Sequence, residues 1–60
     1  MSSLDIFRMI KKDGWFLKAI VGSHHHFIHP TKSGKATVPH PKKNLPQGTI
    51  NNILKQTGLK

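Results

Sequence analysis

Two short connections divide the middle of the chain into three β-prone runs. Gly22-Ser23 is a tight-turn pair, and the polar segment Thr31–Lys35 forms the second connection. Around them lie three runs rich in aromatic, β-branched and histidine residues, which are Trp15–Val21, His24–His29 and Ala36–Val38. A parallel crossover needs about a dozen residues or more, so connections this short join antiparallel strands. The sequence therefore predicts a three-stranded antiparallel sheet.

The segment before the first strand has the pattern of an amphipathic helix. Ser2 and Asp5 have the spacing of a capping box, in which each side chain bonds to the backbone of the other residue. Apolar residues then recur at helical spacing, and two lysines follow where their charge suits the negative end of the helix dipole. Gly14 is typical of the position just past a helix end. We expect a helix over residues 3–13.

A second amphipathic segment closes the chain. Asn44 is predicted to be its N-cap, with Pro46 early in the first turn and Gly58 at its end. Each helix has one apolar stripe, and the economical partner for both is one face of the sheet, which leaves the other face open. The predicted fold class is α+β, in the order α-β-β-β-α, with two helices on one face of the sheet. The double-stranded-RNA-binding domain has the same order of elements.

Composition sets the size and the charge of the domain. The chain has 60 residues, enough for a single small domain over residues 1–60. Ten Lys and Arg residues oppose two acidic residues, and the resulting net charge of +8 favours a polyanionic partner such as nucleic acid. A merely solvated basic surface and an acidic protein partner are the alternatives. No cysteine is present to form a disulfide or to supply a thiolate ligand.

Nothing in the sequence predicts membrane insertion or export. No apolar stretch approaches the roughly 18 residues that a spanning helix needs. Residues 1–5 also lack the basic and apolar regions of a signal peptide. We therefore expect a soluble, cytoplasmic protein that does not associate with a membrane.

Three of the five histidines are consecutive, at His24, His25 and His26. The unperturbed pKa of histidine lies close to neutral pH, so its side chain can take up or release a proton there. Side chains alternate between the two faces of a strand, so His24 and His26 share one face and His25 lies on the other. Phe27 is expected to pack against the helices. This places His24 and His26 on the open face of the sheet.

The remaining histidines are more simply interpreted as structural. His25 and His29 are expected to be partly buried and hydrogen-bonded, whereas His40 is either a loop contact or exposed to solvent. A metal site is the competing functional interpretation of the cluster, because zinc commonly takes three or four ligands that include histidine. Adjacent histidines on a strand diverge, however, and the chain offers no cysteine and few carboxylates. We therefore predict no metal site and no other cofactor.

Five sequence blocks together resemble the HicA toxin family. They are Gly14-Trp15, Gly22-Ser23-His24-His25-His26-Phe27, Thr37-Val38-Pro39-His40, Leu45-Pro46-Gln47-Gly48-Thr49-Ile50 and Ile53-Leu54-Lys55-Gln56-Thr57-Gly58-Leu59. The resemblance extends over nearly the whole chain and implies a fold like the double-stranded-RNA-binding domain. It also implies the toxin of a type II toxin–antitoxin system, an mRNA interferase that a HicB-like antitoxin neutralises.

The same resemblance implies the site residues. The family's catalytic histidine directly follows Gly-Ser, which is His24 here, and Gly22 and Ser23 form the supporting turn. We predict that His24 acts as a general base and that His26 is a second acid–base group or positions the phosphate. Many family members carry Arg-Gln ahead of the turn, whereas this chain has Ala19-Ile20-Val21.

Five lysines are candidate contacts to RNA phosphates, namely Lys18, Lys32, Lys35, Lys42 and Lys43. Lys18 is expected to compensate only in part for the missing basic residue, because neighbouring strand residues point to opposite faces. We expect a monomeric toxin that acts on mRNA without a metal ion. The alternatives are a non-catalytic RNA-binding module and an inactive relic of a toxin.

Overall fold

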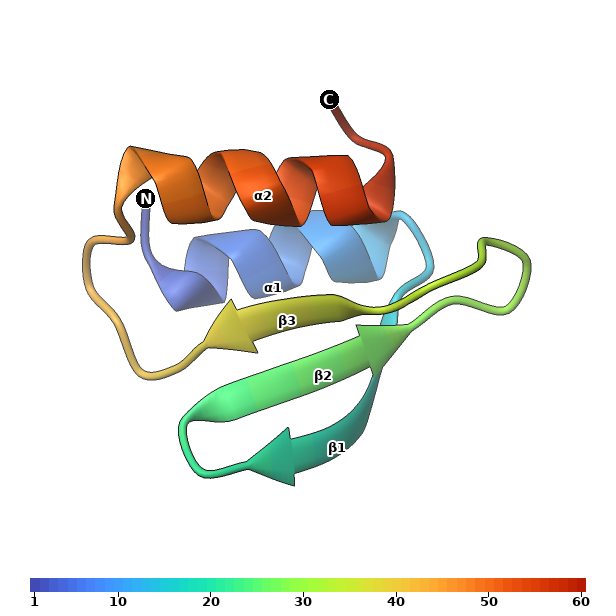
Figure 1. Ribbon diagram of the computed structural model, residues 1–60, viewed down its shortest axis with the longest axis horizontal. Helices are drawn as coiled ribbons and strands as arrows, with labels where there is room; N and C mark the ends of the chain where they lie inside the picture. Colours follow the sequence, from blue (N-terminus) through green and yellow to red (C-terminus); the bar gives the residue numbers. More distant parts are fainter.

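The computed structural model describes all 60 residues and contains two helices and one three-stranded sheet. In chain order the elements are α1 (Ser3–Lys12), β1 (Phe16–Val21), β2 (His24–Ile28), β3 (Ala36–Pro39) and α2 (Gln47–Thr57). Both strand pairs are antiparallel, and β2 lies between β1 and β3 (Figure 1). The predicted α+β fold with α-β-β-β-α order is confirmed.

Helix α1 begins as the sequence predicts. The Ser2 hydroxyl accepts a hydrogen bond from the Asp5 backbone N–H at 3.1 Å, and the Asp5 carboxylate accepts one from the Ser2 N–H at 2.9 Å. This capping box satisfies two backbone donors that would otherwise lack a partner. The helix ends at Lys12 with Asp13 as its C-cap.

Helix α2 ends as predicted but starts differently. Gly58 adopts the left-handed conformation (φ 72°) and caps the C-terminus. The predicted N-cap, Asn44, is wrong, because the cap residue is Pro46, which makes no side-chain capping bond. Leu45 is buried, and its N–H donates to the Met1 carbonyl at 2.9 Å. Leu45 is therefore held against the N-terminus, and the helix begins after it.

The predicted strand limits need three small corrections. Trp15 precedes β1 because its backbone N–H bonds to the Ile10 carbonyl, and its indole is buried at the end of α1. His29 lies just after β2, and Pro39 extends β3 by one residue. In each case contacts with another element decide where the strand ends.

Gly14 and His29 form a close contact between the end of α1 and the loop after β2. Gly14 has φ +106°, and a Cβ there would lie 2.8 Å from His29 Nε2. His29 Nδ1 accepts hydrogen bonds from the backbone N–H groups of Thr31 and Lys32, so its Nε2–H donates to the Asp13 carbonyl at 2.7 Å. The expected structural role of His29 agrees with this geometry, and only glycine suits position 14.

The core lies between the helices and the β2–β3 half of the sheet. Its buried apolar residues are Ile6, Ile10, Trp15, Phe27, Ala36, Val38, Leu45, Ile50 and Ile53. The ring centroid of Phe7 in α1 lies 5.3 Å from that of Phe27 in β2. All six residues of β1 are exposed, since β1 lies at the edge of the sheet away from both helices (Figure 1).

Candidate active site

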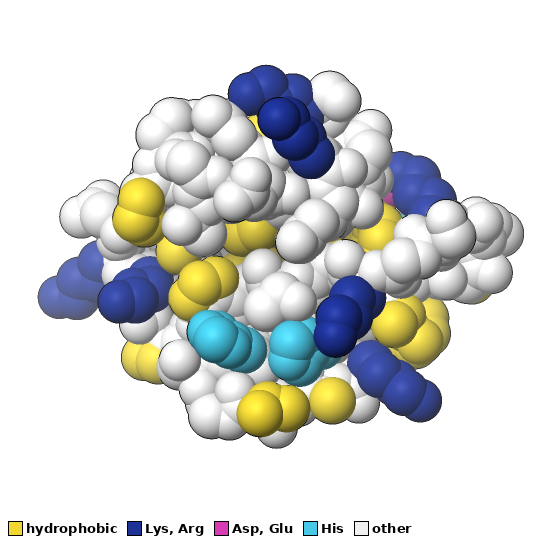
Figure 2. Space-filling model, in the orientation of Figure 1, with side chains coloured by type: hydrophobic (Ala, Val, Ile, Leu, Met, Phe, Trp, Pro, Cys, Tyr) yellow, Lys and Arg dark blue, Asp and Glu magenta, His cyan; other side chains and the backbone are white.

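His24 and His26 lie side by side on the open face of the sheet. Their ring centroids are 6.5 Å apart and the rings are inclined by 74°. Opposite them on β1 are Val21, paired with His24, and Ala19, paired with His26. Figure 2 shows the two histidines together on the exposed surface with a cationic side chain next to one of them. The alternation expected for β2 therefore brings both imidazoles to the same accessible surface.

The two imidazoles differ in how they are held. His26 Nδ1 is hydrogen-bonded to the Thr37 hydroxyl of β3 at 2.9 Å, and its Nε2 has no protein partner. Thr37 is in turn fixed by its backbone N–H, which donates to the Gln56 side chain of α2 at 3.1 Å. His24 is exposed and makes no side-chain hydrogen bond with the protein. His26 is thus oriented by two other elements, whereas both nitrogens of His24 are available to a ligand.

The Gly22-Ser23 turn connects β1 to β2 directly before His24. Gly22 has φ +59°, a conformation that glycine adopts without steric cost. The Ser23 carbonyl accepts a hydrogen bond from the His40 backbone N–H at 2.7 Å, which ties the turn to the end of β3. This backbone bond holds the turn in place directly before His24.

His25 lies on the helix side of the sheet, where it is half-buried. Its ring centroid is 5.4 Å from that of Phe7 and 4.9 Å from that of His40, and its buried Nδ1 has no hydrogen-bond partner. Burial, followed by the nearby His40 and His26, lowers the pKa of His25, which a backbone hydrogen bond at Ser23 opposes in part. The expected partial burial of His25 is confirmed, and its buried Nδ1 forms no hydrogen bond.

The lowered pKa of His25 predicts an acid-sensitive stability. Below the unfolded pKa of about 6.5, the unfolded chain binds a proton at His25 that the folded chain resists. The free energy of unfolding should therefore be highest above that pH and fall as the pH decreases toward the folded pKa. Urea denaturation between about pH 5 and 8 measures this slope.

Replacement of His25 by phenylalanine keeps a ring beside Phe7 and should flatten the slope. Hydrogen bonding to Ser2 and to Lys32 lowers the pKa values of Asp5 and Asp13, respectively, so neither carboxylate titrates in this range. A slope of unchanged size in His25→Phe would assign the effect to another group.

His40 has a structural contact, which resolves the alternatives left open by the sequence. Its Nδ1 is hydrogen-bonded to the buried hydroxyl of Ser3 at 2.7 Å. The same hydroxyl accepts from the Lys42 backbone N–H at 3.2 Å. His40 therefore fastens the loop after β3 to the start of α1.

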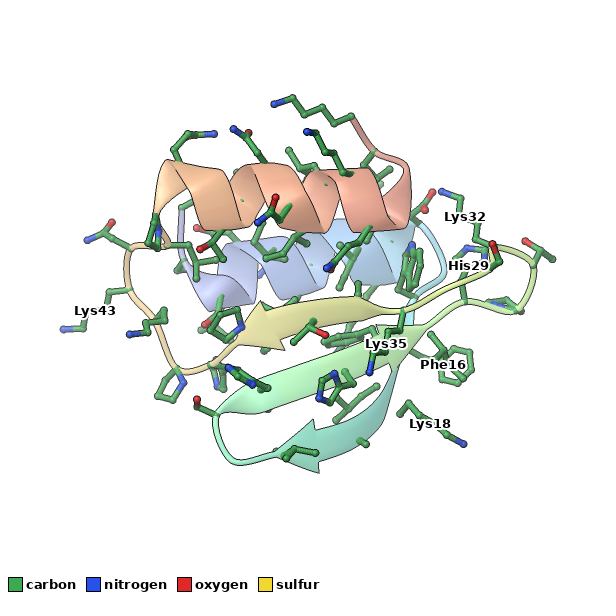
Figure 3. The ribbon with its side chains drawn as sticks, in the orientation of Figure 1. Phe16, Lys18, His29, Lys32, Lys35 and Lys43 are labelled. Atoms are coloured by element: carbon green, nitrogen blue, oxygen red, sulfur yellow. The ribbon has the colours of Figure 1, made fainter.

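The five candidate lysines do not gather at one place. Lys35 extends over β2 near the histidine pair, and Lys18 projects from β1 at the same end of the sheet (Figure 3). Lys42 and Lys43 lie in the loop after β3, where residues 40–43 and the first residues of α1 line a shallow pocket of about 330 Å³. Lys32 forms an ion pair with Asp13 and donates to the Thr57 carbonyl at 3.0 Å. That lysine joins the ends of the two helices in the free protein.

A β-bulge changes what the sequence predicts for Lys18. Leu17 pairs with Phe27 and Ala19 pairs with His26, so Lys18 is an extra residue without a partner on β2. Strict alternation was expected along this strand and is wrong at this point. Leu17 lies on the helix side and Ala19 on the open face, which means that alternation does not fix the direction of Lys18. Alternation along β1 therefore no longer limits how far Lys18 could replace the missing basic residue.

The structure contains neither a cluster of potential metal ligands nor a helix that could span a membrane. No group of three or more His, Cys, Asp or Glu residues is placed to hold a metal ion. Neither helix has the length and apolar character required to cross a bilayer.

The fold and the open face define a small basic α+β protein with a paired-histidine surface. A family model described as the HicA toxin of bacterial toxin–antitoxin systems matches residues 4–59. The chain therefore belongs to the HicA toxin family and is the toxin member of a toxin–antitoxin pair, which implies an antitoxin partner. A comparison with curated proteins found no match.

Proposed function

We propose that this toxin is an mRNA interferase, a metal-independent endoribonuclease that acts in the cytoplasm and is neutralised by a HicB-like antitoxin. The observation that carries the proposal is the pair of accessible imidazoles, His24 and His26, on the open sheet face of a chain with net charge +8. An accessible acid–base pair beside cations matches the needs of RNA cleavage. The single-domain chain is proposed to act as a monomer.

The proposed reaction is transesterification at an RNA phosphodiester. His24 removes the proton from a 2′-OH, the 2′ oxygen attacks the adjacent phosphorus, and the bond from phosphorus to the 5′ oxygen breaks. The products are a 2′,3′-cyclic phosphate and a free 5′-OH. His26 protonates the departing 5′ oxygen or donates to the phosphate from Nε2, since Thr37 holds its other nitrogen at 2.9 Å.

Cations would stabilise the negative charge that develops on the phosphorane oxygens. Lys35 is one candidate, since Figure 3 shows it over β2, the strand that carries both histidines, and Lys18 lies at the same end of the sheet. Lys42 and Lys43 are candidates for phosphates further along the RNA. We give Lys32 a structural role, because its ammonium group is already bonded to Asp13 and to the Thr57 carbonyl.

The experiment that tests this function uses purified toxin, a short RNA and the same RNA with one deoxyribose at the cleavage position. Cleavage of the all-ribose RNA should continue in EDTA and should stop at the deoxyribose, because the attacking 2′-OH is missing there. Cleavage at the deoxyribose would exclude transesterification, and loss of activity in EDTA would exclude a metal-independent reaction. Binding without any cleavage would favour a non-catalytic RNA-binding module or an inactive toxin relic.

A further inference from the structure

Phe16 is a large aromatic residue that the core does not use. It is the first residue of β1, and 48% of its surface is exposed. It pairs with Ile28, and Ile28 lies two residues after His26 on the same strand, so Phe16 is on the open face with the two histidines. A half-exposed phenylalanine on the proposed catalytic face is suited to bind a ligand with a flat, apolar surface.

Two cationic side chains accompany this ring. In Figure 3, Phe16 and Lys18 extend from the same end of β1, and Lys35 extends over β2, the strand that carries His24 and His26. Figure 2 shows the corresponding apolar patch on the surface between two cationic side chains. An exposed aromatic ring flanked by cations is the combination with which proteins bind single-stranded nucleic acid, since the ring stacks on a base and the cations bind the backbone.

The spacing along the sheet suits an RNA strand that also reaches the histidines. Ile28, the cross-strand partner of Phe16, lies two residues from His26 and four from His24. At about 3.3 Å per residue, these separations correspond to about 7 and 13 Å along the strand. A base on Phe16 would therefore belong to a nucleotide only a few positions from the scissile phosphate.

A protein partner is the competing occupant of β1. The exposed apolar residues suited to it are Leu17 and Ile20, which pair with Phe27 and His25 on the helix side of the sheet. Phe16 lies on the opposite side, with the histidines. The apolar residues of β1 are thus divided between two faces, with Phe16 and the smaller Val21 on the face that carries the histidines.

We propose that Phe16 is a nucleobase-stacking site that places the RNA on the open face, with Lys18 and Lys35 holding the flanking phosphates. This proposal deepens the proposed ribonuclease function by assigning the residue that positions the single-stranded substrate. Because one stacked base sets the register of the strand, Phe16 would also select the phosphate presented to His24.

The test measures stacking separately from cleavage. Non-cleavable 2′-O-methyl RNA carrying the fluorescent base 2-aminopurine at successive positions is titrated with the full chain. The wild-type protein should quench one position most strongly. Phe16→Leu should abolish that quenching and weaken binding by roughly 5- to 150-fold, the range for loss of one stacked base, while Phe16→Trp should retain both.

Leu17→Ala is the matched control, because it shortens an exposed side chain of β1 on the other side of the sheet. It should leave RNA affinity and quenching unchanged. Unchanged affinity in Phe16→Leu, or equal losses in Phe16→Leu and Leu17→Ala, would overturn the proposal. Loss of antitoxin binding in Phe16→Leu with normal RNA binding would overturn it too, in favour of a protein contact.

If the protein is not a ribonuclease, the experiments give a different pattern from the one expected if Phe16 does not stack on a base. In that case the wild-type protein leaves ordinary RNA intact, while Phe16-dependent quenching on the 2′-O-methyl RNA still supports the stacking site. In a cleaving protein, Phe16→Leu should also shift or broaden the distribution of cleavage positions, an effect that a merely structural role would not produce.

Discussion

Replacement of His24 by alanine is expected to reduce RNA cleavage by a factor of about 10²–10⁴, the usual contribution of general acid–base catalysis. The imidazole is exposed and forms no side-chain hydrogen bond with the protein, so its removal should leave the fold intact. Single-turnover cleavage of a labelled RNA measures the rate, and thermal unfolding checks the fold. In cells, expression of the variant should no longer arrest growth.

Val21→Ala is the matched control for His24→Ala. Val21 is the cross-strand partner of His24 and is exposed, but it carries no titratable group. Its variant should cleave at close to the wild-type rate. Cleavage by His24→Ala at an undiminished rate would remove His24 from the mechanism. A comparable loss in His26→Ala, together with a shifted pH profile, would identify His26 as the second acid–base group.

Replacement of Phe27 by alanine is expected to lower the free energy of unfolding by about 3–5 kcal/mol, the cost of removing a large buried aromatic side chain. Phe27 is 1% exposed, belongs to the central strand and contacts Phe7 of α1. A domain of this length has a total stability of about 3–9 kcal/mol. The loss is at least about a third of the total stability, so urea titration followed by circular dichroism should show the variant unfolding at a much lower urea concentration than the wild type.

Phe16→Ala provides the comparison, because it removes the same side chain from an exposed position of the same sheet. Its cost should stay below about 1 kcal/mol. If the two variants lost equal stability, β1 would have to be packed against something that the monomer does not contain. If Phe27→Ala lost much less than about 3 kcal/mol, the core would have to collapse around the cavity.

The element order and the histidine pair were predictable from the sequence because both depend on neighbouring residues. The capping box joins Ser2 and Asp5, three positions apart, and the Gly58 cap bonds to carbonyls of the preceding turn. The separation of His25 from His24 and His26 follows from the two-residue period of a strand, once Phe27 marks the buried side. Such short-range rules hold whatever the rest of the chain does.

The predictions that were wrong, and one contact that the sequence did not signal, depend on how separate elements meet. Asn44 has the chemistry of an N-cap, but the neighbouring Leu45 is bonded to Met1. Lys18 was assigned by strict alternation, which the bulge opposite β2 interrupts. Lys32 bonds to Asp13 and Thr57, 19 and 25 positions away, and its contact with RNA stays a prediction. No local pattern in the sequence signals the bond of Leu45, the bulge at Lys18 or the bonds of Lys32.

The sequence by itself therefore determined the order of the elements and the pairing of His24 with His26 on one face, because helix caps, turns and strand alternation act over a few residues. Only the tertiary structure decided that His40 bonds to Ser3, 37 positions away. It also decided that Phe16 stays exposed on the face that carries the histidines, because no element of the fold covers that face. Burial depends on which surfaces meet, and the arrangement of all five elements determines that.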